Sequence, residues 1–364
     1  MVTLVVTTGS GSMDLYAQKL SERLDVPKVY SVIYQHISER FNISWLSREA
    51  LRAVLDDWNF IKLLNKLSGV VHLPNQHLGR YGNFLKTPYI ITVHDLIRYF
   101  DLKGYGTYIH RPNSRDRFYL NRDYRGVTKA TRIIAVSQAT KRDLMYYLRI
   151  PEERISIVYE GINHTIFRAS AQPSDFAYPY ILFVGSEQPR KNLPTLIRAF
   201  GKLKERKQFR DLKLVKVGKA GGKETDFREQ TMNVIKSLNL DGEVIFTEFV
   251  SGEDLRARYC GAECFVLPSL YEGFGFAPLE AMACGCPVIT SDSSSLPEVV
   301  DGAAIKVSPG DVEGLAEALE KVLTDKELSK SLVEKGVDQA AKFSWEQTAE
   351  KTLEVYKDVE KELL

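Results

Sequence analysis

Two glutamates beside a glycine turn have the type and spacing to bind a polyhydroxylated ligand. Glu272 stands just before a Gly-Phe-Gly turn, and Glu280 follows eight residues later. A carboxylate accepts hydrogen bonds from vicinal hydroxyls, and the charge on the acceptor makes each bond worth about 1.5–3 kcal/mol. The glycines let the backbone approach a ligand closely, and a helix start after the turn offers N–H groups to an anion. The segment therefore suits a sugar nucleotide.

The position of the second glutamate depends on where this helix begins. Pro278 suits a first helical turn, because its missing N–H would be unpaired there anyway. We expect the helix to begin near Phe276 or Ala277, with Glu280 in its opening turn. Acids are common in first turns, so an alternative is that Glu280 only favours the helix dipole and that Glu272 only faces solvent.

A pair of cations forms a second phosphate-type pattern. Arg190 and Lys191 follow the apolar run YILFV and precede a helix that Asn192 is expected to cap. Arginine offers a planar fork to a diphosphate, and lysine offers a mobile point charge. Arg-Lys-Asn is also typical of a solvated loop, but its place after a strand favours the phosphate interpretation.

Two weaker patterns lie near the start of the chain. Gly9 and Gly11 follow the apolar run TLVVTT, where their backbone could cradle phosphate or only make a tight turn. His94 and Asp95 end the run YIITV, and α/β proteins bind ligands at the carboxyl ends of parallel strands. A lone histidine in such a place is also commonly structural.

The four cysteines do not predict a metal site. Cys260 and Cys264 are spaced C-x3-C, Cys284 and Cys286 are spaced C-x-C, and no histidine lies near them. Zinc prefers four ligands in a closed shell, whereas these thiols are expected at an apolar strand and at a helix end. We expect core or loop thiols and no metal. The sequence also lacks GxSxG and GxxxxGK[ST] motifs, which argues against serine hydrolases and P-loop enzymes.

The elements that must position these residues alternate between short apolar runs and helical stretches, which is typical of parallel α/β sheets. One series of runs begins at residues 3, 70, 89, 132 and 155, and a second at 180, 212, 243, 264, 287 and 304. A proline-rich segment after residue 166 reads as a linker. The predicted domains are 1–168 and 178–345, with a final helix at 346–364.

Composition limits the classes of protein that remain. A length of 364 residues predicts about two domains, and 44% hydrophobic with 26% charged residues is ordinary for a soluble globular protein. Lys and Arg number 49 against 47 Asp and Glu, so the net charge of +2 argues against nucleic acid as a partner. No run approaches the ~20 apolar residues of a membrane span. Four cysteines without a secretory signal favour a cytoplasmic location.

The whole pattern resembles the retaining GT-B glycosyltransferases of family four, the glycosyl transferases of group 1. The resemblance rests on GSEQPRKN, FTEFVSGEDL, FVLPSLYEGFGFAPLEAMACGCPVITSDSSSLPEVV and SPGDVEGLAEAL, with weaker support from VHDL, VSQATKRDL and VYEGINHTIF. It implies an α/β fold in which two Rossmann-like domains face across a cleft and the final helix crosses back to the first domain. The first domain would bind the acceptor, the second would bind a nucleotide-sugar donor, and no metal would be required.

The resemblance also implies a role for each matching residue. Glu280 would hold the nucleotide ribose, Glu272 would face hydroxyls of the donor sugar, and Arg190 with Lys191 would hold the diphosphate. His94 would approach the sugar near its 6-hydroxyl, oriented by Asp95. Backbone amides would contact sugar or phosphate at a further set of positions, namely Gly9, Gly11, Gly273, Phe274, Gly275 and Phe276. Ser186 is a departure, because several members have an arginine there.

The acceptor is less well defined. Residues 98–142 hold eleven Lys or Arg against three Asp or Glu, and RPNSRDRFYLNRDYRG interleaves arginines with aromatic residues. Such a strip suits a phosphate-bearing or lipid-linked acceptor and peripheral contact at the cytoplasmic face of a membrane. The alternative is a loop with neither role.

The sequence therefore predicts a hexosyltransferase that uses GDP-mannose or UDP-glucose and acts on a glycan, lipid-linked or small-molecule acceptor. SSLPEVV and DVEGLAEAL look most like mannosyltransferase segments, so mannose is favoured. One alternative is a protein that binds sugar nucleotides without turnover, but it should lack Glu272. The other is a Rossmann oxidoreductase, but the sequence lacks a complete dinucleotide fingerprint.

Overall fold

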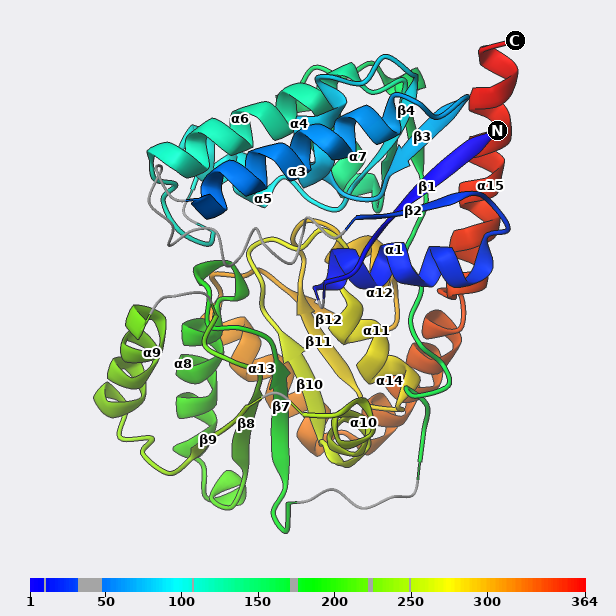
Figure 1. Cartoon of the computed structure of the whole chain (residues 1–364). Coiled ribbons are helices and arrows are strands. Elements are labelled where there is room, and N and C mark those ends of the chain that lie inside the picture. Colours follow the sequence, from blue (N-terminus) through cyan, green and yellow to red (C-terminus); the bar gives the residue numbers. More distant parts are fainter. Residues whose placement is uncertain (10, 32–47, 107, 171–175, 222–224, 249) are drawn as a thin grey trace. The chain divides into compact units, whose positions relative to one another are not determined.

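A computed structural model describes residues 1–9, 11–31, 48–106, 108–170, 176–221, 225–248 and 250–364. The chain divides into two compact units (Figure 1). The N-terminal unit comprises Met1–Tyr105, Arg111–Gly161 and Trp345–Leu364, and the C-terminal unit comprises Gly106–His110 and Ile162–Ser344.

The first unit ends earlier than the boundary at residue 168 that the sequence indicated. Ile162 forms a parallel bridge with Ser344, and its N–H donates to the carbonyl of Phe343 over 3.3 Å. These backbone contacts join the chain after Gly161 to the C-terminal unit, whereas local composition changes only at the proline-rich segment further on.

The N-terminal unit is built on a parallel six-stranded sheet in the order β2-β1-β3-β4-β5-β6. Its strands are β1 (Val2–Thr7), β2 (Lys28–Ser31), β3 (Val70–Leu73), β4 (Tyr89–Val93), β5 (Arg132–Ala135) and β6 (Ile155–Ile157). Every residue of β1, β3 and β4 is buried, as expected for strands covered on both faces. All five predicted runs contain strands. The sequence analysis missed β2, because this edge strand is short and mostly exposed.

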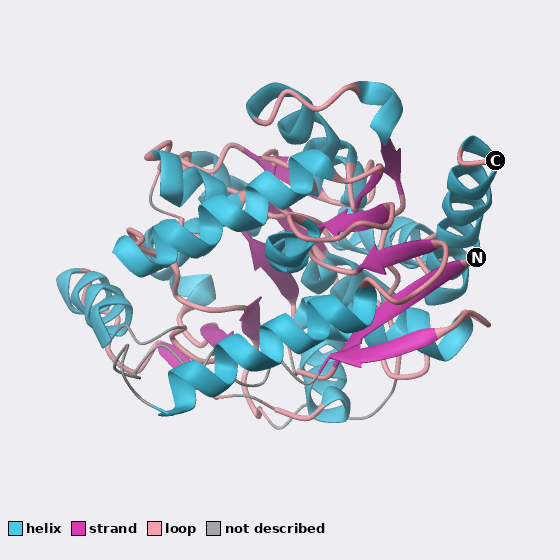
Figure 2. Ribbon diagram, turned by 45° about the horizontal axis from the view of Figure 1, so that its top comes forward, coloured by secondary structure: helices cyan, strands magenta, loops and turns pink. Residues whose placement is uncertain are grey.

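Helices connect these strands and cover the sheet (Figure 2). They are α1 (Ser12–Arg23), α3 (Arg48–Leu64), α4 (Gly79–Gly82), α5 (Ile97–Lys103), α6 (Ser114–Lys129), α7 (Gln138–Tyr147) and α15 (Trp345–Glu362), with 3-10 turns at Gln76–Leu78 and Glu152–Arg154. The final helix, α15, packs in this unit. The hydroxyl of its Tyr356 lies 2.6 Å from Nδ1 of His72 on β3, and its Glu360 pairs with the amino terminus of Met1.

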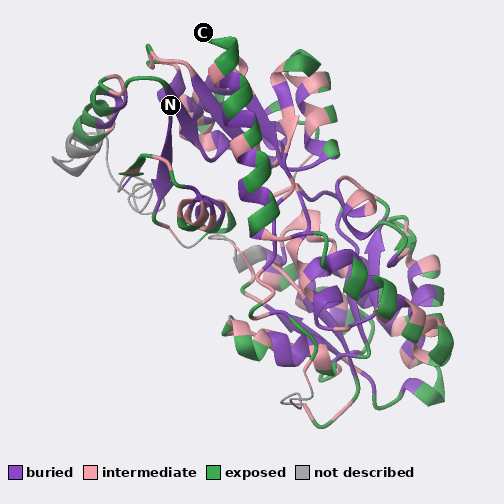
Figure 3. Cartoon of the chain, turned by 90° about the vertical axis from the view of Figure 1, so that its right-hand side faces the viewer, coloured by how far each residue is buried: buried purple, intermediate pink, exposed green. Residues whose placement is uncertain are grey.

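The C-terminal unit repeats the plan with a parallel sheet in the order β12-β11-β10-β7-β8-β9. Its strands are β7 (Tyr180–Val184), β8 (Lys213–Val217), β9 (Val244–Thr247), β10 (Cys264–Leu267), β11 (Val288–Ser291) and β12 (Ile305–Val307). All six lie in predicted apolar runs. The central strands of both sheets are buried, whereas the edge strands β2 and β12 are partly exposed and the helices expose one side (Figure 3).

Helices also cover this second sheet. They are α8 (Leu193–Lys204), α9 (Thr225–Ser237), α10 (Gly252–Gly261), α11 (Phe276–Ala283), α12 (Leu296–Val300), α13 (Val312–Thr324) and α14 (Lys326–Ala340), with 3-10 turns at Pro189–Lys191 and Lys207–Phe209. Among the described residues of either unit, no helix is long and apolar enough to span a bilayer.

Candidate active site

The strand order of the second sheet brings the two predicted ligand-binding loops together. β7 and β10 are hydrogen-bonded neighbours, although residues 185–263 lie between them in sequence. Because they are parallel, the loop after β7 and the loop after β10 leave the same edge of the sheet. The first loop carries Arg190 and Lys191, and the second carries Glu272.

These three residues form a charge cluster, the name used below for Arg190, Lys191 and Glu272. Nη1 of Arg190 lies 2.7 Å from Oε2 of Glu272, and Nζ of Lys191 lies 2.7 Å from Oε1. The Ser269 hydroxyl donates to the same Oε1 over 2.7 Å. The structure thus places the carboxylate predicted to face a sugar against the two cations predicted to face a diphosphate.

The cluster keeps its charges. Burial raises the pKa of the Glu272 carboxyl, but the positive charges of Lys191 and Arg190 outweigh it and hold that pKa at about 2. Burial also lowers the pKa of Lys191, an effect that Glu272 opposes. Buried charges of opposite sign stabilise one another only while both are present, so loss of one partner leaves the other uncompensated.

Glu280 has a different environment and a different position from the one predicted. It lies in the second turn of α11, because the helix begins at Phe276 and its first turn holds no acid. The Tyr259 hydroxyl, from α10, donates to its Oε2 over 3.1 Å. Burial raises the pKa of Glu280 to about 7, although the Tyr259 hydrogen bond acts against this. The pKa values of the two glutamates are therefore shifted in opposite directions, although only eight residues separate them.

The turn between the glutamates requires glycine. Gly275 has a φ of +120°, and a Cβ there would lie 3.0 Å from Cδ2 of Leu296. The Ser295 hydroxyl lies 3.0 Å from the carbonyl of Glu272 and 2.6 Å from that of Phe274. Sequence reasoning missed Ser295 as a support of this turn, although the SDSSSLPEVV segment contains it.

The aromatic side chains of the turn pack inward. The Phe274 ring makes edge contacts with the rings of Phe276 and Phe343, with centroids 5.4 Å and 5.7 Å apart. Only the backbone of Phe274 is therefore suited to a ligand. Gly273 lies in the same turn, between Glu272 and Phe274.

Asn192 does not cap α8 in the predicted way. It occupies the N-cap position with φ +54°, but its side chain makes no cap hydrogen bond. Instead, its Nδ2 donates to the carbonyls of Pro268, over 3.0 Å, and Pro309, over 2.6 Å. This amide ties the cation-bearing loop to the segment that precedes Glu272.

A second ion cluster anchors the start of the cation-bearing loop. Glu187 is buried and lies 2.6 Å from Nη2 of Arg228 and 3.1 Å from Nζ of Lys216. Its backbone N–H donates to the carbonyl of Ala220 over 2.7 Å. Sequence reasoning missed Glu187, and its only signal was its place in GSEQPRKN.

In the N-terminal unit, both ring nitrogens of His94 have hydrogen-bond partners. Nδ1 lies 2.9 Å from Oε1 of Glu160, and Nε2 lies 2.9 Å from the carbonyl of Pro74. Burial lowers the pKa of His94, but the nearby Glu160 raises it further, so the net shift is upward. An imidazolium donates to both acceptors. The orienting carboxylate is therefore Glu160, not the predicted Asp95, whose Oδ1 accepts from the N–H of Ile97.

An acid from α1 contacts the glycine segment after β1. The N–H of Gly11 donates to Oδ2 of Asp14 over 3.1 Å, and a Cβ on Gly9 would lie 2.3 Å from the same oxygen. Ser10 lies outside the described residues. The Asp14 carboxylate thus occupies an amide that the sequence analysis assigned to phosphate, and its negative charge disfavours an anion there.

All four cysteines lie in the C-terminal unit as free thiols. Cys264, Cys284 and Cys286 are buried, and Cys260 is half-buried. Over the described parts of the chain, no group of three or more His, Cys, Asp or Glu is arranged to hold a metal ion.

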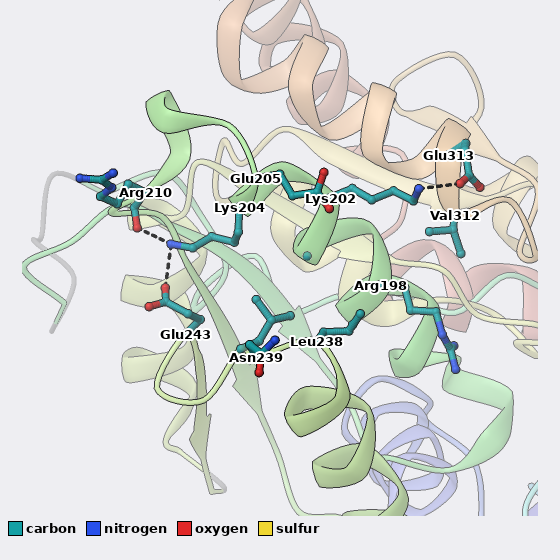
Figure 4. Close-up of a pocket in the computed structure, with 12 residues that line it drawn as sticks. Arg198, Lys202, Lys204, Glu205, Arg210, Leu238, Asn239, Glu243, Val312 and Glu313 are labelled. Atoms are coloured by element: carbon teal, nitrogen blue, oxygen red, sulfur yellow. Dashed lines mark hydrogen bonds and ion pairs between the residues drawn. The ribbon is translucent and has the colours of Figure 1, made fainter.

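A surface pocket of about 710 Å³ lies along α8 (Figure 4). Its charges largely neutralise one another, because Lys202 pairs with Glu313 and Lys204 pairs with Glu243, each over 2.7 Å. Lys204 also donates to the carbonyls of Phe209 and Leu212, over 3.2 Å and 3.0 Å. These lysines fasten neighbouring segments, so the charge cluster remains the better candidate site.

Two family descriptions together match nearly the whole chain. "Glycosyltransferase Family 4" matches residues 2–166, and "Glycosyl transferases group 1" matches residues 167–339. The chain belongs to the group 1 glycosyltransferases. The second match contains the whole charge cluster and Glu280.

Curated relatives of this glycosyltransferase include bacterial mannosyltransferases. The serotype-specific mannosyltransferase WbdA of Escherichia coli is 32% identical over 275 residues, which is 73% of this chain but 33% of WbdA. O-antigen chain mannosyltransferase B of Escherichia coli is 29% identical over 68% of this chain and 66% of its own length. The chain thus spans about one third of the length of WbdA.

Solved structures show the same fold. Sucrose-phosphate synthase from Thermosynechococcus elongatus matches with a TM-score of 0.74 at 21% identity, over 98% of both chains. HepE from Anabaena in complex with UDP-glucose matches with a TM-score of 0.77 at 16% identity, over 98% of this chain and 99% of HepE. The glycosyltransferase therefore has the GT-B fold, as the sequence predicted.

Proposed function

We propose that this glycosyltransferase moves a hexose from a nucleotide diphosphate sugar to a hydroxyl of a glycan, lipid-linked or small-molecule acceptor, with retention of configuration and without a metal. The charge cluster at the carboxyl ends of β7 and β10 carries the proposal. It holds two cations for a diphosphate, and each lies 2.7 Å from one oxygen of the carboxylate that would bind sugar hydroxyls.

Donor binding is an exchange of partners within this cluster. Diphosphate oxygens compete with Glu272 for Arg190 and Lys191, and both cations remain charge-compensated throughout. The released carboxylate then accepts hydrogen bonds from hydroxyls of the sugar. The diphosphate thus replaces Glu272 as the partner of the two cations, and the sugar hydroxyls replace the cations as partners of Glu272. No buried charge is left unpaired, which would be costly.

In the transfer step, the oxygen of the acceptor hydroxyl bonds to the anomeric carbon of the sugar as the bond between that carbon and the diphosphate oxygen breaks. The hydroxyl proton passes to the leaving diphosphate, on which negative charge grows as the bond breaks. Arg190 and Lys191 stabilise that charge, and loss of one such preorganised donor typically costs about 10²–10³ in rate. Glu280 accepts hydrogen bonds from the nucleotide ribose. Because its pKa is raised to about 7, it binds these hydroxyls best when the pH is high enough to ionise it.

GDP-mannose is the favoured donor, with mannose transferred, and UDP-glucose, with glucose transferred, is the alternative. Relatives that are named mannosyltransferases support the first, and the HepE complex with UDP-glucose supports the second. A sugar-nucleotide-binding protein without turnover remains the competing function, and it would bind a donor without releasing nucleoside diphosphate.

Thermal unfolding with GDP-mannose, UDP-glucose and the bare nucleotides tests the donor. A ligand at about 100 times its dissociation constant adds about 2.7 kcal/mol to the free energy of unfolding. Release of nucleoside diphosphate in the presence of an acceptor tests turnover, and the same assay with EDTA tests metal independence. Stabilisation by no donor would contradict the proposed function, and activity lost with EDTA but restored by Mg²⁺ would contradict metal independence.

We further propose a cytoplasmic protein with peripheral membrane contact, because a lipid-linked acceptor would lie at a bilayer surface. The basic strip at residues 98–142 supports this proposal.

A further inference from the structure

One stripe of α6 combines basic and aromatic side chains. Phe118, Arg122, Arg125 and Lys129 recur at spacings of four, three and four, which places them on one face of a helix. The Phe118 side chain is 51% exposed, and Arg125 and Lys129 are exposed. The opposite face of α6 is buried through residues such as Leu120, so the stripe lies on the side of the helix that faces away from its packed neighbours.

A loop residue extends this surface. Phe84, which follows α4, is 42% exposed, and the Arg122 guanidinium lies over both Phe84 and Phe118, 5.1 Å and 5.2 Å from the ring centroids. Nδ2 of Asn83 donates to the carbonyl of Arg122 over 2.8 Å and fixes this loop against α6. We name Phe84, Phe118, Arg122, Arg125 and Lys129 the basic-aromatic face. Figure 1 shows α4 and α6 within the N-terminal unit.

The acids of α6 do not neutralise this face. Asp123 is buried and accepts from Nε and Nη2 of Arg80 over 2.7 Å and 2.8 Å. Asp116 caps the start of the helix, where it exchanges hydrogen bonds with Asn113. Neither acid shares the spacing of the stripe, so three positive charges and two exposed phenylalanines share this face.

We propose that the basic-aromatic face docks on an anionic phospholipid bilayer. Lysine and arginine are attracted to acidic headgroups, and insertion of a phenylalanine ring between the headgroups is favourable because it removes apolar surface from water. A cation over an aromatic ring keeps its charge at the surface while the ring enters the interface. A single-stranded nucleic acid would use both the charges and the rings, but the net charge of +2 gives the chain no overall field that favours such a partner. The inference rests on the proposed peripheral association and names the surface that mediates it.

Sedimentation with vesicles tests this assignment without donor or acceptor. The full chain should bind vesicles of phosphatidylcholine with phosphatidylglycerol and should not bind phosphatidylcholine alone. A triple variant with Arg122→Gln, Arg125→Gln and Lys129→Gln should bind on the order of a hundredfold more weakly, because each charge contributes about fivefold. Raising the ionic strength from about 0.1 M to about 1 M shortens the Debye length from about 10 Å to about 3 Å and should release the wild-type protein.

Charge-matched and ring-matched variants control for nonspecific effects. Substitution of three exposed lysines of α14 by glutamine should leave vesicle binding unchanged; these are Lys326, Lys330 and Lys335. Phe118→Ala should weaken binding about tenfold. Tyr146→Ala should not, although Tyr146 is 64% exposed and lies under Arg149 in the same unit.

The outcomes separate the two levels of the inference. If the wild-type protein binds no anionic vesicle, peripheral association itself is wrong. If it binds and the triple variant binds equally well, another surface is responsible. A soluble RNA that competes fully with the vesicles would assign the face to nucleic acid instead. The triple variant should retain transfer to a water-soluble acceptor, so failure of the docking surface is distinguishable from failure of the proposed reaction.

Discussion

At the residue scale, Lys191 pairs with Glu272, and in the proposed reaction it exchanges this partner for the diphosphate of the donor. We expect Lys191→Ala to reduce kcat by about 10²-fold or more, because it removes a donor aimed at developing charge. Lys202→Ala is a matched control, since Lys202 also pairs with a glutamate over 2.7 Å but lies on an exposed surface. Steady-state kinetics of both variants check this prediction. Wild-type turnover in an Arg190→Ala, Lys191→Ala double variant would contradict it.

The two glutamates should fail in different ways. Glu280→Gln removes a charged acceptor from the ribose, so bare nucleoside diphosphate should bind about ten- to a hundredfold more weakly. Glu272→Gln should barely change that affinity, and should instead reduce turnover and discrimination between sugars. Calorimetry with bare nucleotide, beside kinetics with the full donor, measures both effects. An equal loss of nucleotide affinity in both variants would mean that the motif acts as one undivided anchor.

The raised pKa of Glu280 predicts a pH dependence. Ribose hydroxyls prefer the ionised carboxylate, so affinity for intact donor should rise as the pH increases through about 7. Folding shows the opposite trend: the folded protein holds this proton more tightly than the unfolded chain, so its stability falls as the pH rises from about 4.5 to about 7. Titration calorimetry from pH 6 to pH 8, about one unit either side of that pKa, measures the affinity. A profile in Glu280→Gln as steep as that of the wild type would assign the dependence to another group.

At the element scale, the loop between β10 and α11 depends on a backbone that only glycine adopts freely. Gly275→Ala should lower the free energy of unfolding by about 1–3 kcal/mol, because φ is +120° and the new Cβ would meet Leu296 at 3.0 Å. Gly302→Ala is the control, since a Cβ there has nothing within 4 Å and φ is not positive. Denaturant unfolding compares the two, and equal stability would show that the turn relaxes at no cost.

At the scale of the whole molecule, the last helix completes the first unit. Burial lowers the pKa of His72 to about 3, so its ring is neutral, and Nδ1 has the Tyr356 hydroxyl as a partner 2.6 Å away. Tyr356→Phe leaves that buried nitrogen without this partner and should cost about 1–3 kcal/mol of unfolding free energy. Tyr146→Phe, on an exposed ring, should cost almost nothing. If denaturant unfolding shows no difference between them, the hydrogen bond does not hold α15 in place.

The sequence alone determined the local features. Apolar runs located eleven of the twelve strands among the described residues, because the β period and burial on both faces are written into consecutive residues. It also placed Arg190, Lys191 and Glu272 in loops after strands, since glycine and proline mark such turns by their own backbone preferences. The exposed edge strand β2 carried no such signal.

The tertiary structure decided which side chains meet. Glu272 lies between Arg190 and Lys191 because β10 pairs with β7, and a strand order that differs from chain order is set by the packing of whole elements. For the same reason, His94 is oriented by the distant Glu160 and not by Asp95, the next residue in the sequence. Glu280 is likewise contacted by Tyr259, which lies on another helix. Contacts between distant residues depend on the register of sheets and helices. No local pattern of residue types encodes that register. The register nevertheless determines which charges and hydrogen-bond partners surround each group in the site.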